Sequence, residues 1–288
     1  MIEKVNKILL PYFYISAAFF LIYSGLFWLI QKYTHFDNDY ISYWIPVIIS
    51  AIIVWFFLRK ILKKIVIPEK QYQFTLFLSW ILLVAPVLTC IFYISTENGT
   101  ITYLKNTDEI FEKPKTKYYS IKNVKIDKNI SGLFVVKSAV NRGNEIGVGC
   151  YFTSPIMNKS DSIDQINNLW IGVLEGEKFS NRVFDDKVKQ QNEIDTFVQN
   201  AKNEYPKNKV KTNFLIRVTD LEEKKIFVSS IETTGKIFDD DMIILKEGIG
   251  NFEDRSGTSL TWTIILFLIS NLAWTLLTIF QKLKKNGR

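Results

Sequence analysis

The stretch Arg59-Lys60-Ile61-Leu62-Lys63-Lys64-Ile65-Val66-Ile67-Pro68-Glu69-Lys70 lies between two long apolar runs, and the arrangement of the whole chain depends on it. Its five basic residues are Arg59, Lys60, Lys63, Lys64 and Lys70. Lys and Arg beside membrane spans are retained on the cytoplasmic side. These residues are therefore predicted to determine the topology.

Four apolar runs reach the roughly 20 residues that a helix needs to cross a bilayer. They lie at about residues 9–30, 41–58, 74–94 and 260–280, and none contains a charged residue or histidine. Runs of this length, each flanked by charge, favour membrane spans over buried helices of a soluble protein. The first run is longer than the apolar part of a cleaved signal peptide, so we expect it to remain as an anchor.

Basic residues are distributed unequally between the ends of these runs. The N-terminal segment, the loop and the C-terminal tail together hold eleven Lys and Arg, whereas the loop after the first run holds only Lys32. We therefore expect a multi-pass inner-membrane protein with both termini in the cytoplasm and residues 95–258 in the periplasm. Three tryptophans are expected at the outer membrane interface: Trp28, Trp44 and Trp262.

The predicted fold is an integral membrane protein with four transmembrane α-helices, three before and one after an extracytoplasmic α+β domain. Residues 1–94 form the three-helix region with its cytoplasmic basic loop 59–73, residues 95–258 the domain, and residues 259–288 the fourth helix and basic tail.

The net charge of +7 arises at the membrane flanks. Residues 95–258 hold 24 Lys and Arg against 25 Asp and Glu, so the domain is close to neutral. A nucleic-acid-binding domain would carry the basic excess itself, so nucleic acid is not expected as a partner. The lipid bilayer is the expected partner, and the basic loop is expected to contact lipid headgroups in addition.

Within residues 95–258 the spacing of apolar residues predicts several strands and one helix. Strands are expected at about residues 100–104, 117–126, 133–140, 146–152, 169–174, 213–218, 225–231 and 242–245. The turn Asn141-Arg142-Gly143-Asn144 joins two of them as a hairpin, and the strand over 117–126 carries an irregularity.

The helix is predicted from a single apolar face, formed by Ile194, Phe197, Val198, Ala201 and Tyr205. Asp185 and Asp186 suit the positive end of its dipole, and Pro206 terminates it. Strands gathered around one long helix favour an α+β layer over a sandwich.

Residues that could carry catalysis or bind a metal are few. His35 is the only histidine and lies in a short loop, so no Ser-His pair or histidine-cysteine zinc site is expected. Asp239-Asp240-Asp241 lacks the spacing of a calcium loop and is predicted to be a solvated turn. We predict no catalytic residue, no cofactor site and no metal site, and hence no enzymatic activity.

The remaining motifs have structural interpretations. Gly143, Gly147 and Gly149 lack the Gly-Lys-Ser/Thr of a nucleotide loop and are predicted to be hairpin and strand glycines. Cys90 and Cys150 are separated by a membrane boundary and are not expected to pair.

The spans contain a few polar or helix-bending residues. Asn271, in the fourth apolar run, is a candidate for hydrogen bonding to a neighbouring helix. Pro46 and Pro86 lie deep in their runs and are predicted to kink them. A substrate pathway is the alternative interpretation, although transporters generally use intramembrane ionisable groups.

Four segments within residues 74–280 occur in a recognisable order. They are Leu104-Lys105-Asn106-Thr107-Asp108-Glu109-Ile110, Pro114-Lys115-Thr116-Lys117-Tyr118-Tyr119-Ser120-Ile121-Lys122, Tyr151-Phe152-Thr153-Ser154-Pro155-Ile156 and Phe252-Glu253-Asp254-Arg255-Ser256-Gly257. This order of segments resembles a region found in some bacterial rhomboid-family proteins of the Bacteroidota. Rhomboid proteases need a Gly-x-Ser-Gly serine and a histidine within their spans. Here Ser24-Gly25 lacks the first glycine and no span holds a histidine. The resemblance therefore implies an accessory membrane and periplasmic part without the protease module.

The leading functional hypothesis is a non-enzymatic inner-membrane protein whose periplasmic domain binds a protein or an envelope ligand. The alternatives are an accessory subunit of a channel or transporter complex, and an adaptor for a rhomboid-type intramembrane protease. Besides the bilayer, another membrane protein or a second copy of the chain is a candidate partner.

Overall fold

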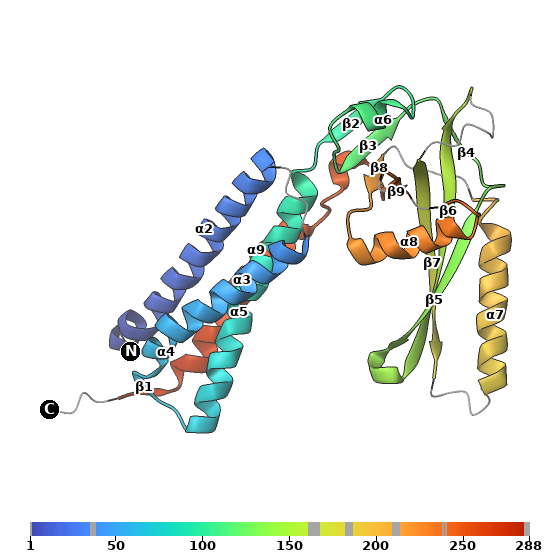
Figure 1. Ribbon diagram of the computed structural model, residues 1–288. Coiled ribbons are helices and arrows are strands. Elements are labelled where there is room, and N and C mark those ends of the chain that lie inside the picture. Colours follow the sequence, from blue (N-terminus) through green and yellow to red (C-terminus); the bar gives the residue numbers. More distant parts are fainter. Residues whose placement is uncertain are drawn as a thin grey trace. The chain divides into compact units, whose positions relative to one another are not determined.

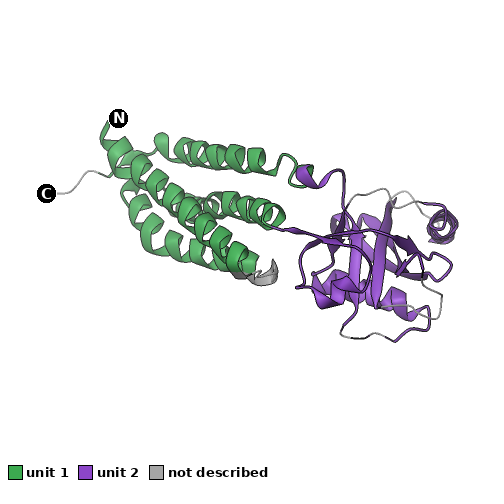
Figure 2. Ribbon diagram, turned by 90° about the horizontal axis from the view of Figure 1, so that it is seen from above, with its two compact units in different colours: residues 1–98, 254–288 green, residues 99–253 purple. Residues whose placement is uncertain are grey.

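The computed structural model describes residues 2–34, 39–160, 168–181, 187–208, 214–237, 239 and 241–284. The chain forms two compact units (Figure 2). Unit 1 comprises residues 1–98 and 254–288, and unit 2 comprises residues 99–253.

Unit 1 consists of four long apolar helical segments, which are long and apolar enough to cross a membrane. The helices are α1 (Ile2–Lys4), η1 (Val5–Leu9), α2 (Leu10–Thr34), α3 (Asp39–Ile53), η2 (Val54–Leu58), α4 (Arg59–Leu62), α5 (Glu69–Glu97) and α9 (Ser259–Ile279). Three segments precede the α+β region and one follows it, which confirms the predicted fold class (Figure 1). The protein is a multi-pass membrane protein.

The interior of unit 1 is held together by aromatic packing and a buried hydrogen bond. The rings of Tyr12 and Trp274 stack in parallel with their centroids 3.9 Å apart. The Trp274 Nε1–H donates to Ser79 Oγ at 2.8 Å, so α9 is joined to α5. Where no water is available, such a bond satisfies an indole N–H that would otherwise be costly to bury.

One end of unit 1 is closed by a short two-stranded ribbon. Strand β1 (Ile65–Val66) pairs antiparallel with β10 (Lys282–Leu283). Nearby, the ammonium group of Lys4 donates to the carbonyl oxygens of Ile279 and Gln281, which satisfies acceptors at the C-terminal end of α9. The basic loop and the C-terminal segment therefore lie at the same end of the helices.

The opposite end of unit 1 is joined by polar contacts. Arg255 Nε donates to the Thr96 carbonyl oxygen at 3.1 Å, and its guanidinium also reaches Glu97. Asn98 Nδ2 donates to the Trp28 carbonyl oxygen at 3.3 Å. These contacts hold together the two places where the chain leaves for unit 2 and returns from it.

Unit 2 is built around a mixed sheet with the strand order β2-β3-β8-β9-β7-β6-β4, and β5 also pairs with β6. Its strands are β2 (Ile101–Leu104), β3 (Tyr118–Ile121), β4 (Val124–Ile126), β5 (Gly132–Val140), β6 (Glu145–Asn158), β7 (Leu169–Ser180), β8 (Leu215–Arg217) and β9 (Ile243–Glu247). Its helices are α6 (Glu109–Glu112), η3 (Asn141–Gly143), α7 (Lys187–Glu204), α8 (Leu221–Glu232) and η5 (Phe252–Asp254). The β2–β3 and β7–β9 pairs are parallel, and the others are antiparallel.

The two long helices pack on opposite faces of this sheet. On the α7 face, Ile194 and Ala201 pack with sheet residues that include Cys150, Phe152 and Phe179. On the α8 face, Phe227 and Ile231 pack with Trp170, Met242 and Ile244. Figure 1 shows α8 crossing the strands, whereas α7 stands beside the long β5–β6–β7 arm.

Two strand predictions are wrong. The segment 117–126 is two strands, because Asn123 adopts a positive φ of 56° and redirects the chain. β3 pairs with β2 and β8, whereas β4 pairs with β6. The segment 225–231 belongs to helix α8, whose N-cap residue Asp220 accepts a hydrogen bond from the Glu223 N–H at 2.7 Å.

The predicted long helix and hairpin are confirmed. α7 ends before Pro206, and Ile194, Ala201 and Tyr205 on its predicted apolar face are buried. Asp185 and Asp186 lie outside the described residues. β5 and β6 form the hairpin around residues 141–144, and β6 extends further than predicted.

Replacing Ser79 with Ala tests the buried hydrogen bond of unit 1. Loss of the acceptor leaves the Trp274 N–H without its partner, so we expect the free energy of unfolding to fall by about 1 kcal/mol. The measurement is thermal unfolding of the full-length protein in detergent micelles. Thr261→Ala, which removes an exposed hydroxyl from α9, is the matched control. Equal midpoints for the two variants would show that the bond contributes nothing.

Candidate functional site

The basic-loop residues that are predicted to determine the topology lie at the ribbon end of unit 1. The guanidinium of Arg59 stacks over the Trp55 ring, 4.6 Å from its centroid. The side chains of Lys60, Lys63, Lys64 and Lys70 are exposed. A cation over an aromatic ring is a favourable arrangement where a helix meets the membrane surface.

The structure also shows where the predicted interface tryptophans and the helix-packing candidate Asn271 lie. Trp28, Trp44 and Trp262 are all exposed on the helical segments of unit 1. Asn271 Nδ2 donates to Ser16 Oγ at 3.3 Å and to the Phe267 carbonyl oxygen at 2.9 Å. The first of these bonds joins α9 to α2.

The residues considered for catalysis or metal binding are only partly within the described part of the chain. His35 and Asp240 lie outside the described residues. In that described part, no group of three or more His, Cys, Asp or Glu side chains is placed to hold a metal ion. Burial raises the pKa of the Cys150 thiol, with a smaller contribution from Glu175, so the reactive thiolate is disfavoured.

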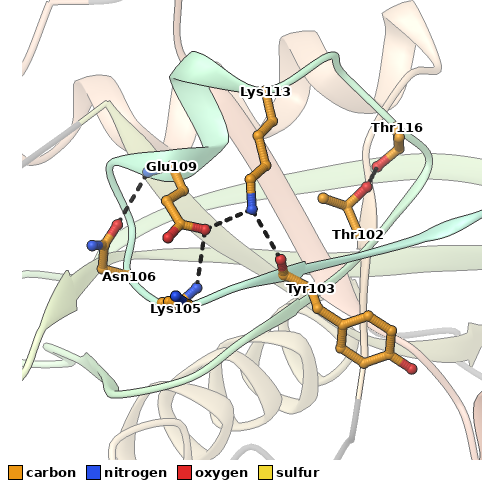
Figure 3. A network of polar contacts seen from close by, with 7 residues as sticks. All are labelled: Thr102, Tyr103, Lys105, Asn106, Glu109, Lys113 and Thr116. Atoms are coloured by element: carbon orange, nitrogen blue, oxygen red, sulfur yellow. Dashed lines mark hydrogen bonds and ion pairs between the residues drawn. The ribbon is translucent and has the colours of Figure 1, made fainter.

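A polar network in the β2–β3 connection is structural (Figure 3). The Glu109 carboxylate accepts from the Lys113 ammonium at 2.7 Å and from the Lys105 N–H at 3.2 Å. Both contacts, the first being the larger, lower the pKa of Glu109. Asn106 Oδ1 accepts from the Glu109 N–H at 3.1 Å, so this segment is fixed by its own polar groups.

The α7 face of the sheet is covered by aromatic packing at the C-terminal end of α7. The Tyr205 ring stacks on Phe152 with centroids 4.4 Å apart, and its hydroxyl lies 2.8 Å from Ser154 Oγ. Burial raises the pKa of Tyr205 to about 12. The ammonium group of Lys128 lies over the same ring and donates to the Tyr205 carbonyl oxygen at 2.8 Å.

The α8 face is covered only in part. Beside α8, the Phe227 ring lies against Gly172, where an added Cβ would be 2.7 Å from a ring carbon. Further along the arm, three side-by-side rows run from β5 through β6 to β7. They are Phe134, Tyr151 and Leu174; Val136, Gly149 and Gly176; and Ser138, Gly147 and Lys178. We call the surface formed by these nine residues the glycine face.

The glycine face is hollow because three of its residues have no side chain. Gly147, Gly149 and Gly176 border a hollow of about 390 Å³. An added Cβ at Gly176 would meet only the Val148 carbonyl oxygen, at 3.5 Å. Leu174, 50% exposed, stands at one end of the hollow. Glycines inside strands often mark a place where a ligand or another backbone approaches closely.

A second hollow of about 380 Å³ adjoins the first at Leu174. Its lining combines the apolar Phe227 with an ion pair between Lys246 and Glu223. In this pair Lys246 Nζ contacts both carboxylate oxygens of Glu223, at 2.7 and 2.8 Å. Leu174 lines both hollows, so the two lie next to each other on the α8 face.

The outer edge of β5 borders the glycine face. The Leu133 N–H points away from β6 and donates to Thr233 Oγ1 at 3.2 Å. In an antiparallel pair, alternate residues point the same way, so the N–H groups of Val135, Lys137 and Ala139 also face outward. Among the described residues, β6 is the only strand that pairs with β5. This edge therefore offers a row of backbone donors and acceptors.

This site is not among those predicted from the sequence. The interpretation of Gly147 and Gly149 as hairpin and strand glycines describes their backbone but not the surface that they form. The available signal was their spacing, since glycines two residues apart in a strand lie on one face. Gly176 could not be linked to them, because its position opposite Gly149 depends on the β6–β7 register.

The fold and site define a multi-pass membrane protein with an α+β domain that carries an open sheet face and edge. Comparison of the chain with family models, curated proteins and solved structures found no match in any of the three. The resemblance to the rhomboid-associated region therefore stays a prediction.

Two glycine substitutions test where the α8 face is covered. A Cβ at Gly132 would lie 1.8 Å from the Ser230 carbonyl oxygen of α8, so Gly132→Ala should lower the free energy of unfolding by about 2 kcal/mol or more. Gly176→Ala should change it by less than about 0.5 kcal/mol, because that position is open. Chemical denaturation of unit 2 in the full-length protein measures both. A loss at Gly176 as large as that at Gly132 would contradict the open face.

Proposed function

We propose that this protein is a non-enzymatic, membrane-anchored binding protein whose α+β domain takes up an extended segment of a partner protein as an additional strand beside β5. The observation that carries the proposal is the outward-facing row of backbone groups along β5. An extended polypeptide has the matching alternation of donors and acceptors, and strand addition uses it for affinity. Exposed strand edges of this kind readily pair with another chain.

The glycine face supplies a basis for selecting the partner. Side chains of an added strand alternate between the two faces of the sheet. Those on the α8 face would lie beside Phe134 and Val136 and reach toward the hollow at Gly149. Large apolar side chains at every second position of the partner segment fit this surface.

The charge of β5 favours acidic residues at the intervening positions. Lys137 is the only charged residue of β5, and its ammonium group donates to Gln191 Oε1 of α7 at 3.3 Å. A carboxylate on an added strand would lie near this ammonium group on the α7 face. Opposite charges across neighbouring strands stabilise the pair.

The membrane helices give this domain a fixed location. We place unit 2 outside the cytoplasm, in the periplasm, because the basic residues gather at the ribbon end of unit 1. The bond between Asn271 and Ser16 supports a packing role for Asn271 rather than a solute pathway. The helices then serve to hold the binding domain at the membrane surface.

Two substitutions at Lys137 test strand addition. Lys137→Pro removes an outward-facing N–H, and proline is tolerated on a strand edge, whereas Lys137→Ala removes the charge and keeps the N–H. The probe is a panel of fluorescein-labelled peptides of about seven residues, with apolar residues alternating with Glu. Anisotropy titrations with the full-length protein in detergent measure their affinity.

We expect Lys137→Pro to weaken peptide binding by roughly 10-fold or more, because a hydrogen bond is lost and strand approach is blocked. Lys137→Ala should weaken it only several-fold. Thermal unfolding of both variants verifies that the fold is retained. Equal affinity of the Pro and Ala variants, or no binding of the panel to the unmodified protein, would refute strand addition at β5.

A further inference from the structure

The β1–β10 ribbon gathers lysines from distant parts of the chain. Lys63 and Lys64 follow α4, whereas Lys282 and Lys284 follow α9. Pairing of Ile65 with Leu283 places these segments side by side, and the Lys284 N–H donates to the Lys64 carbonyl oxygen at 2.8 Å. We call these four lysines the basic ribbon.

The backbone of the basic ribbon is anchored by apolar side chains in the core of unit 1. Ile65 and Leu62 are buried in the core of unit 1, and Leu283 packs against the same core. Lys282 and Lys284 flank Leu283, so their side chains point the other way and are exposed. The apolar residues fix the backbone, and the ammonium groups face solvent.

Carboxylates do not neutralise the basic ribbon within the described part of the chain. The ion pairs of unit 1 there are Lys7 with Glu3 and Arg255 with Glu97. Glu69, the acidic residue nearest to the ribbon in sequence, accepts from Gln73 Nε2 at 3.0 Å. The ribbon therefore presents uncompensated positive charge at one end of the membrane helices.

Apolar side chains next to the ribbon indicate which anion it suits. Trp55, Phe56 and Phe57 in η2, just before α4, are exposed on the outside of the helices, Trp55 by 62%. Arg59 stacks over Trp55, so a cation sits directly beside this aromatic surface. A phospholipid offers a phosphate for the ammonium groups and acyl chains for the aromatic rings, whereas a free phosphate offers only the first.

We propose that the basic ribbon is a binding site for the headgroup of an anionic phospholipid. Phosphate oxygens would accept from the Lys64 and Lys284 ammonium groups, which come from two segments that only the ribbon brings together. Lysine binds phosphate as a mobile point charge, so the site would take a class of anionic lipids rather than one headgroup. Lipid bound there would link the basic loop to the C-terminal segment.

The test uses the full-length protein in neutral detergent micelles and fluorescent phosphatidylglycerol as the probe. Lys64→Gln with Lys284→Gln removes two ribbon charges, and Lys202→Gln with Lys225→Gln removes two exposed charges from unit 2. About 1 kcal/mol per lysine predicts a loss of roughly 30-fold for the ribbon variant and little change for the control.

Two further binding measurements distinguish a lipid site from a site for free phosphate and from non-specific binding of lipid. Soluble glycerol phosphate should not displace the probe at concentrations where unlabelled phosphatidylglycerol does, and phosphatidylcholine should bind equally to all three proteins. Unchanged affinity of the ribbon variant, an equal loss in the control variant, or displacement by glycerol phosphate as effective as by the lipid would each overturn the proposal.

Discussion

Polar groups inside a bilayer have no water to bind, and the structure of unit 1 depends on this constraint. Its helices satisfy their own backbone, and some interior polar side chains find partners across helices, as Trp274 does with Ser79 and Asn271 with Ser16. Charged side chains are confined to the two ends. Lys4 is an instructive case, because its ammonium group serves the last carbonyl groups of α9 instead of facing lipid.

The α+β domain is under a different constraint, because its polar groups can bind water. Each face of its sheet is either covered by apolar packing or exposed to solvent. The α7 face is closed by apolar packing and by the Lys128–Tyr205 contact, in which burial lowers the pKa of the Lys128 ammonium group. The α8 face is left open along the arm, and glycines reduce the apolar area exposed there. This asymmetry is what distinguishes one surface of the domain as a candidate for recognition.

The parts of the fold that depend on local sequence could be predicted, and those that depend on register could not. Charge-free runs identify spans from composition alone, and the apolar face that includes Ile194 identifies α7. The α8 segment is predicted as a strand because Ile226-Phe227-Val228 is a short run of β-branched and aromatic residues, which is typical of strands. Asp220 and Glu223 nevertheless form a recognisable helix start. The glycine face and the basic ribbon depend on strand pairing between distant segments, which no local pattern contains.

The topology that we propose puts the basic ribbon and the α+β domain on opposite sides of the bilayer, with the domain outside the cytoplasm. Single cysteines at Lys64 and at Ile237, which is 89% exposed, report the two sides, and native Cys90 and Cys150 are buried. A membrane-impermeant maleimide applied to intact spheroplasts should label the Ile237→Cys variant. It should label the Lys64→Cys variant only after the membrane is opened. Labelling of Lys64→Cys in intact spheroplasts with protection of Ile237→Cys would contradict the account.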